Sequence, residues 1–179
     1  YENRGPDIRA RARALQLMLD GAGIPLRVNY GADTHLVPEV LAGLRDGRVP
    51  TLGGSRYFLL EPSHTVRPPR FVEAVFEFVG AGYVPIITHP ERLTWVAEHY
   101  DEFLQLARSG VWLQITGGAL LGKFGKHAER YAERFVSEGW CAVLASDGHT
   151  TSRRAPLLAK AAQRAGQLIG HDEARRMVL

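Results

Sequence analysis

Chemically capable side chains follow the short apolar run from Val84 to Ile87. This run is short and β-branched, and it is preceded by glycines, which is typical of a buried strand. His89 can bind a divalent metal through a neutral ring nitrogen, and Arg92 carries a guanidinium fork that fits a phosphate group. A lone histidine at a strand end more often makes only a hydrogen bond. The role of His89 therefore depends on which other side chains lie beside it.

Polar groups follow other apolar runs in the same way. Because the carboxyl ends of parallel strands share one face of an α/β fold, we expect these groups to line one rim. They are carboxylates and imidazoles without cysteine, which favours manganese, magnesium, iron or zinc over softer metals. The groups are Asp33 and His35 after the run 25–30, Glu61 and His64 after 57–60, and Ser146, Asp147 and His149 after 141–145.

Each of these residues also has a structural interpretation. Asp33 and Asp147 can be N-caps of the helices that follow them. For Asp147 we favour metal binding, because Gly148 lets the backbone turn and His149 adds an imidazole. Glu61 can be a ligand, a base or a hydrogen-bonding partner, and the sequence does not choose between these roles.

Histidines in loops or helical patterns are weaker candidates. His35 and His64 are in predicted loops, where a histidine is usually solvated, so a role near the site stays open for both. Three others lie in or beside helical patterns with polar neighbours, and we expect them at the surface: His99, His127 and His171.

Two further stretches concern anions. Arg153 and Arg154 precede a predicted helix, and either can join Arg92 around an anionic group. The glycine-rich stretch 117–125 lacks the ending of a phosphate-binding loop and the spacing of a dinucleotide fingerprint, so we predict a loop packed over the rim. Cys141 lies in a predicted buried strand and no Ser has a Gly-x-Ser-x-Gly frame, which disfavours nucleophilic hydrolysis.

The elements that must position these residues alternate along the chain. This alternation predicts βαβ units and a parallel sheet, either open or closed into a barrel. We expect strands at 25–30, 57–60, 84–87, 111–115 and 141–145. We expect helices at 7–20, 38–45, 70–79, 96–107, 127–137 and 155–165, and a short one from Asp172.

Composition limits the class of protein. The 179 residues are 45% hydrophobic, enough for one domain with a sizeable core, and we expect 1–179 to form a single domain. A formal charge of +3, from 22 basic and 19 acidic residues, is too weak to indicate nucleic-acid binding. The single cysteine, the lack of a long apolar run and the lack of a signal peptide predict a cytoplasmic protein without membrane insertion.

Four motifs together resemble one family. They are Gly31-Ala-Asp33, the run from Pro85 to Arg92 that contains Thr-His-Pro-Glu-Arg, the run 114–125, and Leu144-Ala-Ser-Asp-Gly-His149 followed by Arg154-Ala-Pro156. Their order and spacing are similar to those of the bacterial metal-dependent protein-tyrosine phosphatases of the PHP superfamily, the CpsB/YwqE group. Any one motif alone would be weak, but the four together are specific and span nearly the whole chain.

The resemblance implies a distorted (β/α)7 barrel with several metal ions, most often Mn2+, at its carboxyl rim. Asp33, His89, Asp147 and His149 would be metal ligands, with Asp147 also counted among the catalytic residues. Arg92 and Arg154 would hold the substrate phosphate. The implied reaction is metal-assisted hydrolysis of phosphotyrosine in the tail of a bacterial tyrosine kinase that regulates capsule or exopolysaccharide synthesis.

The chain departs from the family pattern in two places. Asp33 stands where the family usually has Glu, and a shorter carboxylate needs a shift of backbone or ion to bridge two metals. The family's opening His-x-His strand, Asp-Asp-Gly loop and Thr-Pro-His segment do not occur here, so the chain resembles the C-terminal three-quarters or so of the domain. A barrel without its first strands would expose an unpaired edge, which predicts lower stability or association into a homo-oligomer.

Two alternatives to the tyrosine phosphatase remain open. One is a PHP phosphatase that acts on a small metabolite such as histidinol phosphate. The other is a metal-poor relative that binds a phosphorylated partner without hydrolysing it.

Overall fold

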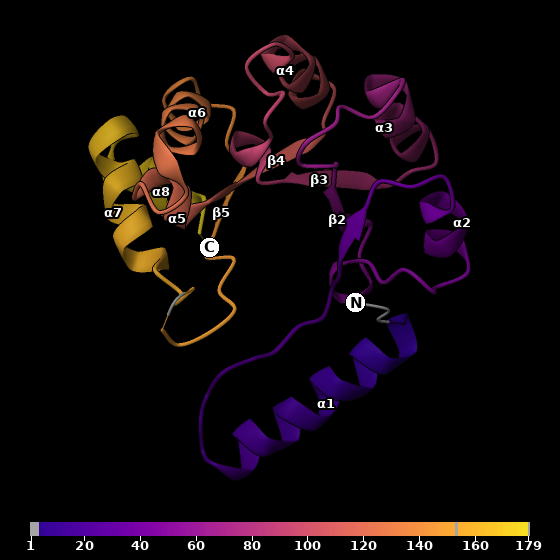
Figure 1. Ribbon diagram of the computed structural model, residues 1–179. Helices are drawn as coiled ribbons and strands as arrows, with labels where there is room; N and C mark the ends of the chain where they lie inside the picture. The colour runs from indigo at the N-terminus through magenta and orange to yellow at the C-terminus, as the bar shows by residue number, and fades with distance from the viewer. Residues whose placement is uncertain (1–3, 153, 179) are drawn as a thin grey trace.

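A five-stranded parallel sheet lies at the centre of the computed structural model, which describes residues 4–152 and 154–178 (Figure 1). The strand order follows the sequence, so each crossover moves the chain one strand along, and all the carboxyl ends lie at one edge. The predicted α/β class with a parallel sheet is confirmed. The strands are β1 (Asp33–His35), β2 (Tyr57–Glu61), β3 (Val84–Thr88), β4 (Trp112–Thr116) and β5 (Val143–Ala145).

Helices cover the outer side of the arc that the strands form. In Figure 1, α2, α3, α4 and α6 lie outside the arc, whereas α1 lies apart from them on its concave side. Two 3-10 turns are η1 (Leu52–Gly54) and η2 (Pro90–Arg92). The helices are α1 (Gly5–Gly21), α2 (Val40–Arg45), α3 (Phe71–Gly80), α4 (Tyr100–Arg108), α5 (Gly117–Leu120), α6 (Gly125–Ser137), α7 (Leu158–Ile169) and α8 (His171–Arg176).

Aromatic side chains fix the helices that lie against β3. Phe71 and Phe78 are on one face of α3, as the helical period requires, and both are buried. The Phe71 ring lies 5.3 Å from the Trp95 ring and 5.6 Å from the Phe103 ring, measured between centroids. Full burial of such a side chain contributes about 1.5–3 kcal/mol, so this cluster gives η2 and the loop after it a rigid base.

The helix α1 is largely exposed, with Gly5 as its one buried residue. Leu17 and Met18 are each 72% exposed. The segment after α1 is held by a side chain of the helix. The Gln16 amide donates to the carbonyl of Leu26 (3.0 Å), and its oxygen accepts from the amide of Val28 (2.8 Å).

These bonds explain why the predicted strand at 25–30 is wrong. The carbonyl of Leu26 and the amide of Val28 find their partners on the Gln16 side chain, and none of the residues 25–30 is paired in a strand. The first strand is β1, so Asp33 begins a strand instead of following one. This short strand pairs with β2 in the register Asp33 to Leu59.

Other boundaries also differ from the predictions. The helix expected from Val96 begins at Tyr100, and the helix expected from Ala155 begins at Leu158. Cys141 is buried but precedes β5 instead of lying in it, and the glycine-rich stretch predicted as a loop contains α5. A Cβ at Gly117 would lie 2.6 Å from Cβ of Ala161, so the glycine allows α5 to pack against α7. In the described part of the chain, no helix has both the length and the apolar character needed to cross a membrane.

Candidate functional site

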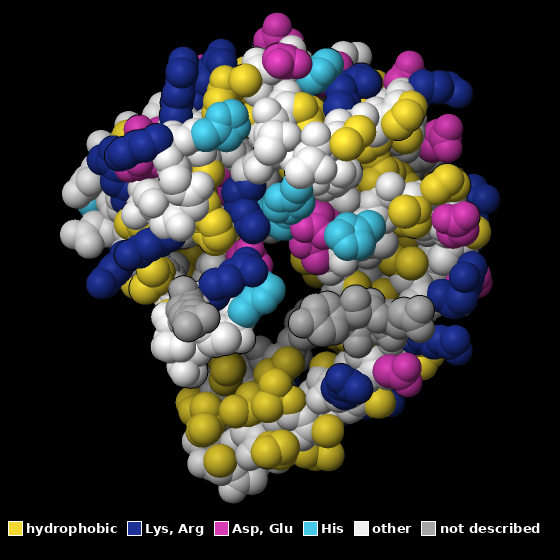
Figure 2. Space-filling view, in the orientation of Figure 1, with side chains coloured by type: hydrophobic (Ala, Val, Ile, Leu, Met, Phe, Trp, Pro, Cys, Tyr) yellow, Lys and Arg dark blue, Asp and Glu magenta, His cyan; other side chains and the backbone are white. Residues whose placement is uncertain are grey.

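A cavity of about 710 Å3 opens at the carboxyl rim of the sheet. Figure 2 shows a hollow on this face with histidine, acidic and basic side chains around it. The residues that the family resemblance implies as metal ligands or phosphate-binding groups all line this cavity. The lining includes Asp33, His35, Glu61, His89, Arg92, Asp147, His149 and Arg154.

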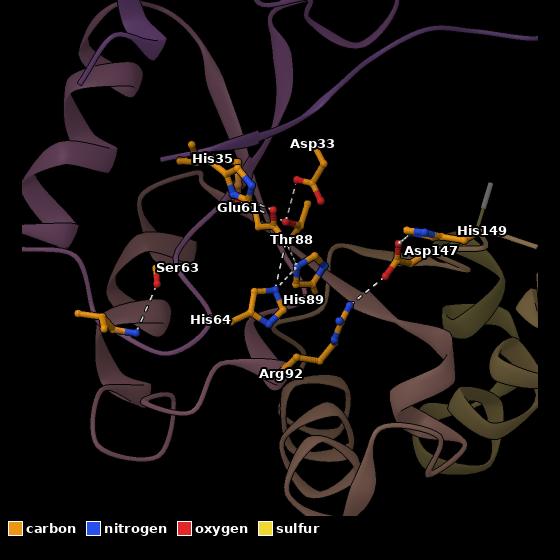
Figure 3. Close-up of polar contacts among 12 residues, drawn as sticks. Asp33, His35, Glu61, Ser63, His64, Thr88, His89, Arg92, Asp147 and His149 are labelled. Atoms are coloured by element: carbon orange, nitrogen blue, oxygen red, sulfur yellow. Dashed lines mark hydrogen bonds and ion pairs between the residues drawn. The ribbon is translucent and has the colours of Figure 1, made fainter. Parts of the chain in front are cut away.

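Three side chains form a group that can hold a metal ion (Figure 3): Glu61, His64 and His89. Oε1 of Glu61 lies 2.9 Å from Nε2 of His89 and 3.1 Å from Nε2 of His64, and the two Nε2 atoms are 3.1 Å apart. The second carboxylate oxygen, Oε2, is 2.9 Å from Nδ1 of the exposed His35. One carboxylate and two imidazoles facing a common point fit a hard or borderline divalent cation.

The backbone at the ends of β2 and β3 creates this group. Glu61 is the last residue of β2, and β3 is its direct neighbour in the sheet. His89 has a left-handed backbone (φ 37°), and its amide donates to the carbonyl of Gln114 in β4 (2.9 Å). This unusual conformation turns the chain sharply into η2, with Pro90 at its first position. Such strain is common at functional sites.

Burial sets the protonation states of this group. Desolvation lowers the pKa of His89 to about 4, with a further contribution from the charge of Arg92. Desolvation opposes ionisation of Glu61, but hydrogen bonds from His89 and His64 outweigh it and hold the pKa below its usual value. At neutral pH the His89 ring is therefore neutral and the Glu61 carboxylate is charged. These are the forms that bind a cation.

Asp33 lies beside this group on β1. Its Oδ1 accepts a hydrogen bond from Oγ1 of Thr88 (3.0 Å). The surrounding cavity wall desolvates the carboxyl group although the residue is solvent accessible, and the nearby charge of Glu61 adds to this, which raises the pKa to about 6. The charge of Asp147 contributes in the same direction. A cation bound beside Asp33 and Glu61 would relieve this repulsion between carboxylates.

Asp147 and His149 form a second group after β5. Oδ2 of Asp147 accepts a hydrogen bond from Nη1 of Arg92 (2.9 Å) and another from Nη2 of Arg154, while Oδ1 lies 3.1 Å from Nε2 of His149. The sharp turn that we assigned to Gly148 occurs at Asp147, whose φ is 46°. Both carboxylate oxygens of Asp147 thus face cationic or imidazole groups of this chain.

Arg92 and Arg154 lie around a common aromatic ring. The guanidinium carbon of Arg92 is 4.4 Å from the centroid of the Phe124 ring, and that of Arg154 is 5.9 Å from it. Stacking on the ring fixes the direction of both guanidinium groups. Two fixed guanidinium groups at a cavity wall form a suitable site for a phosphate group.

Glu91 lies beneath the site and is fully buried. One carboxyl oxygen accepts a hydrogen bond from the amide of Thr116 (3.0 Å), and the other has no partner among the described residues. Desolvation raises the pKa of Glu91 to about 8, although the Thr116 amide acts in the opposite direction. Glu91 therefore ties the η2 turn, which carries Arg92, to the end of β4.

The structure also places the histidines whose roles were uncertain or that were predicted to be at the surface. His64 belongs to the metal-binding group although we left its role open; the short spacing from Glu61 was the available signal. His99, predicted at the surface, is half-buried, with Nδ1 3.0 Å from Oε1 of Glu102. His127 and His171 are exposed as expected. Arg153 lies outside the described residues.

Comparisons with known proteins identify the family of the chain. A sequence model of the family described as "Capsular polysaccharide synthesis, CpsB/CapC" matches residues 1–179. The chain is 33% identical over 156 residues to tyrosine-protein phosphatase YwqE of Bacillus subtilis, which covers 86% of this chain and 61% of YwqE. It is 26% identical over 156 residues to a putative tyrosine-protein phosphatase, CapC, of Staphylococcus aureus, which covers 86% of this chain and 60% of CapC. The chain thus spans about three-fifths of the length of these relatives.

A solved structure is also similar. It belongs to a study of YwqE from Bacillus subtilis and CpsB from Streptococcus pneumoniae, described there as "unique metal-dependent tyrosine phosphatases". The TM-score is 0.92 at 27% sequence identity, and the match covers 99% of this chain and 72% of the other. This likeness confirms the fold that the sequence motifs implied.

Proposed function

The chain belongs to the CpsB/CapC family of capsular polysaccharide synthesis, and from this we propose that it is the larger part of a metal-dependent protein-tyrosine phosphatase. The single observation that carries the proposal is the cavity where a carboxylate and two imidazoles meet beside two arginines. Metal ligands next to an anion site fit hydrolysis of a phosphomonoester. The relatives named as tyrosine-protein phosphatases support phosphotyrosine as the substrate.

We assign Glu61, His64 and His89 to a first metal ion, and Asp33, Asp147 and His149 to the rest of a multinuclear centre. Divalent ions held there supply Lewis acidity towards the phosphate oxygens and activate water for attack. The oxygen and imidazole donor set is compatible with Mn2+, which we propose as the preferred ion over Mg2+, Fe2+ or Zn2+.

The arginines have two roles in this proposal. Arg92 and Arg154 bind the phosphate oxygens and stabilise the charge that these oxygens carry during in-line attack. In the structure both arginines pair with Asp147. Phosphate binding to the same guanidinium groups would weaken these ion pairs, and the Asp147 carboxylate would then be available to a cation.

The biological setting is also part of the proposal. We propose a cytoplasmic protein, with 1–179 as one domain, that dephosphorylates the phosphotyrosine-containing tail of a bacterial tyrosine kinase controlling capsule or exopolysaccharide synthesis. The family description supports the connection with capsule synthesis. We further propose that the open sheet edge at β1 favours a homo-oligomer.

The test is hydrolysis of a phosphotyrosine peptide by this chain and by the longer protein, with added Mn2+ and after chelation by EDTA. We expect metal-dependent release of phosphate that Arg154→Ala strongly reduces. Faster hydrolysis of histidinol phosphate than of the peptide would favour a small-metabolite phosphatase. Binding of the peptide without hydrolysis by either length of chain would favour a non-catalytic phosphoprotein-binding relative.

A further inference from the structure

A second cavity, of about 450 Å3, adjoins the site on the far side of Arg154. The two cavities share Asp147 and Arg154 as lining residues. A group bound in the second cavity therefore lies next to the position that we propose for the phosphate. The proposed chemistry at the rim does not use this second cavity.

The walls of the second cavity combine an apolar surface with positive charge. Leu121 and Phe124 contribute apolar atoms, whereas Lys123 and Lys160 contribute ammonium groups. Both lysines are exposed. The one carboxylate in the lining, Asp147, already pairs with Arg92 and Arg154, so it does not neutralise the lysines.

The two lysines differ from a nearby lysine that serves as a reference. Lys126 forms an ion pair with Glu129 within α6 (2.7 Å). Lys123 lies in the segment before α6, and Lys160 lies in the first turn of α7. Neither lysine forms an ion pair with the residues that the structure describes. The amino-terminal end of α7 also begins at this wall and adds positive potential there.

We propose that this second cavity binds an acidic side chain close to the phosphotyrosine in the substrate, with Lys123 and Lys160 as specificity-determining residues. The inference rests on the proposed function, because the phosphate bound at Arg92 and Arg154 sets the distance to the acidic side chain. The carboxylate pairs with the lysines, and its methylene groups contact Phe124 and Leu121. The predicted substrate is thus a phosphotyrosine flanked by Asp or Glu.

The test compares phosphotyrosine peptides that carry Glu or Gln at the positions on either side of the phosphotyrosine. Binding to the full chain with Mn2+ is followed by fluorescence anisotropy, and KM and kcat are measured separately. Each exposed ion pair contributes about 0.2–1 kcal/mol, so we expect the Glu peptides to bind about 2- to 10-fold more tightly. The difference should decrease at high salt.

Charge reversal locates the effect. The double variant Lys123→Glu/Lys160→Glu should abolish or invert the preference for Glu, by raising KM more for the Glu peptides than for the Gln peptides. Lys126→Glu is the matched control, because this exposed lysine lines neither cavity, and it should keep the wild-type preference. Equal affinity for Glu and Gln peptides, or no binding of either, would overturn the inference. A preference for Glu without hydrolysis of any substrate would sink the proposed function and leave the acidic subsite standing.

Discussion

The two halves of the site differ in how their side chains are held. Glu61, His64 and His89 come from the ends of adjacent strands, and their donor atoms face one another at metal-binding distances (Figure 3). Asp147 and His149 follow β5, which is separated from β3 by β4. The Asp147 carboxylate is held by Arg92 and Arg154, and it does not belong to the group formed by the first three side chains.

The first half, around His89, is preorganised to bind a cation. In the second half, Asp147 is instead engaged in ion pairs with arginines. His89 is buried, neutral and fixed by its backbone, so metal binding there needs little rearrangement. His149 is 56% exposed at its side chain, and Asp147 must give up ion pairs before it can bind a metal. In the proposed function, phosphate binding to the two arginines would therefore favour cation binding to Asp147.

Removal of Arg92 tests the link between the halves and should have the largest effect. Arg92→Ala removes a guanidinium group that is positioned over Phe124 and directed at the cavity. Loss of one such charge-stabilising donor typically reduces turnover by about 100- to 1,000-fold. Phosphotyrosine peptide hydrolysis measures the loss.

A matched control for Arg92 exists elsewhere in the fold. Arg108 stacks on Trp140 (5.0 Å to the ring centroid) without lining either cavity. Arg108→Ala should therefore keep wild-type turnover. A similar loss in both variants would mean that Arg92 acts through stability and not through the phosphate.

Metal titration separates the halves directly. Glu61→Gln removes the carboxylate that contacts both His64 and His89. We expect Mn2+ affinity at this group to fall by about 100-fold or more, because loss of a residue that only orients a ligand already costs about 10- to 100-fold. His149→Ala should lower the same affinity less than about 10-fold. Calorimetry with Mn2+ gives both values. Equal losses would indicate one shared ion between the halves.

The buried Glu91, which lies beneath the first half of the site, predicts a pH dependence of stability. The pKa of Glu91 is raised to about 8 in the folded chain from 4.5, so between these values the folded state binds more protons than the unfolded state. The free energy of unfolding should then fall as pH rises, by up to about 1.4 kcal/mol per pH unit. The opposing contribution of His89 fades as pH rises through its unfolded value of 6.5, and the contribution of Asp33 fades as pH rises through its folded value of about 6.

Urea unfolding of the metal-free protein between pH 7 and 8, where the contributions of His89 and Asp33 are fading, measures this slope. Glu91→Gln replaces the carboxyl group with a neutral amide of similar shape and should remove most of the slope. A variant that retains the wild-type slope would show that Glu91 is already ionised in the folded chain.

Phe124 should give the smallest effect. Phe124→Leu keeps an apolar contact but removes the aromatic face under Arg92, which is worth about 0.5–1 kcal/mol at an accessible position. We expect kcat/KM for the phosphotyrosine peptide to fall about 2- to 5-fold. Phe124→Tyr retains the ring face and serves as the control, so an equal decrease in both variants would argue against the stacking.

The rim was predictable from the sequence because strand ends and polar residues follow one another in chain order. The run before His89 and the run before Asp147 each showed where a parallel strand ends. The apolar run at 25–30 led to a wrong strand prediction. Two of its backbone groups, in Leu26 and Val28, bond to the Gln16 side chain instead of to another strand. A strand propensity cannot reveal that a side chain ten or more residues away takes the hydrogen bonds.

The sequence by itself determined the α/β class, the family resemblance and the set of side chains at the rim, because alternation and motif spacing are local along the chain. Only the tertiary structure decided that His64 joins Glu61 and His89, that Asp147 is held by two arginines, and that a lysine-lined cavity adjoins them. Those relations depend on which strands are neighbours and on the left-handed backbone at His89 and Asp147, which direct the side chains in space.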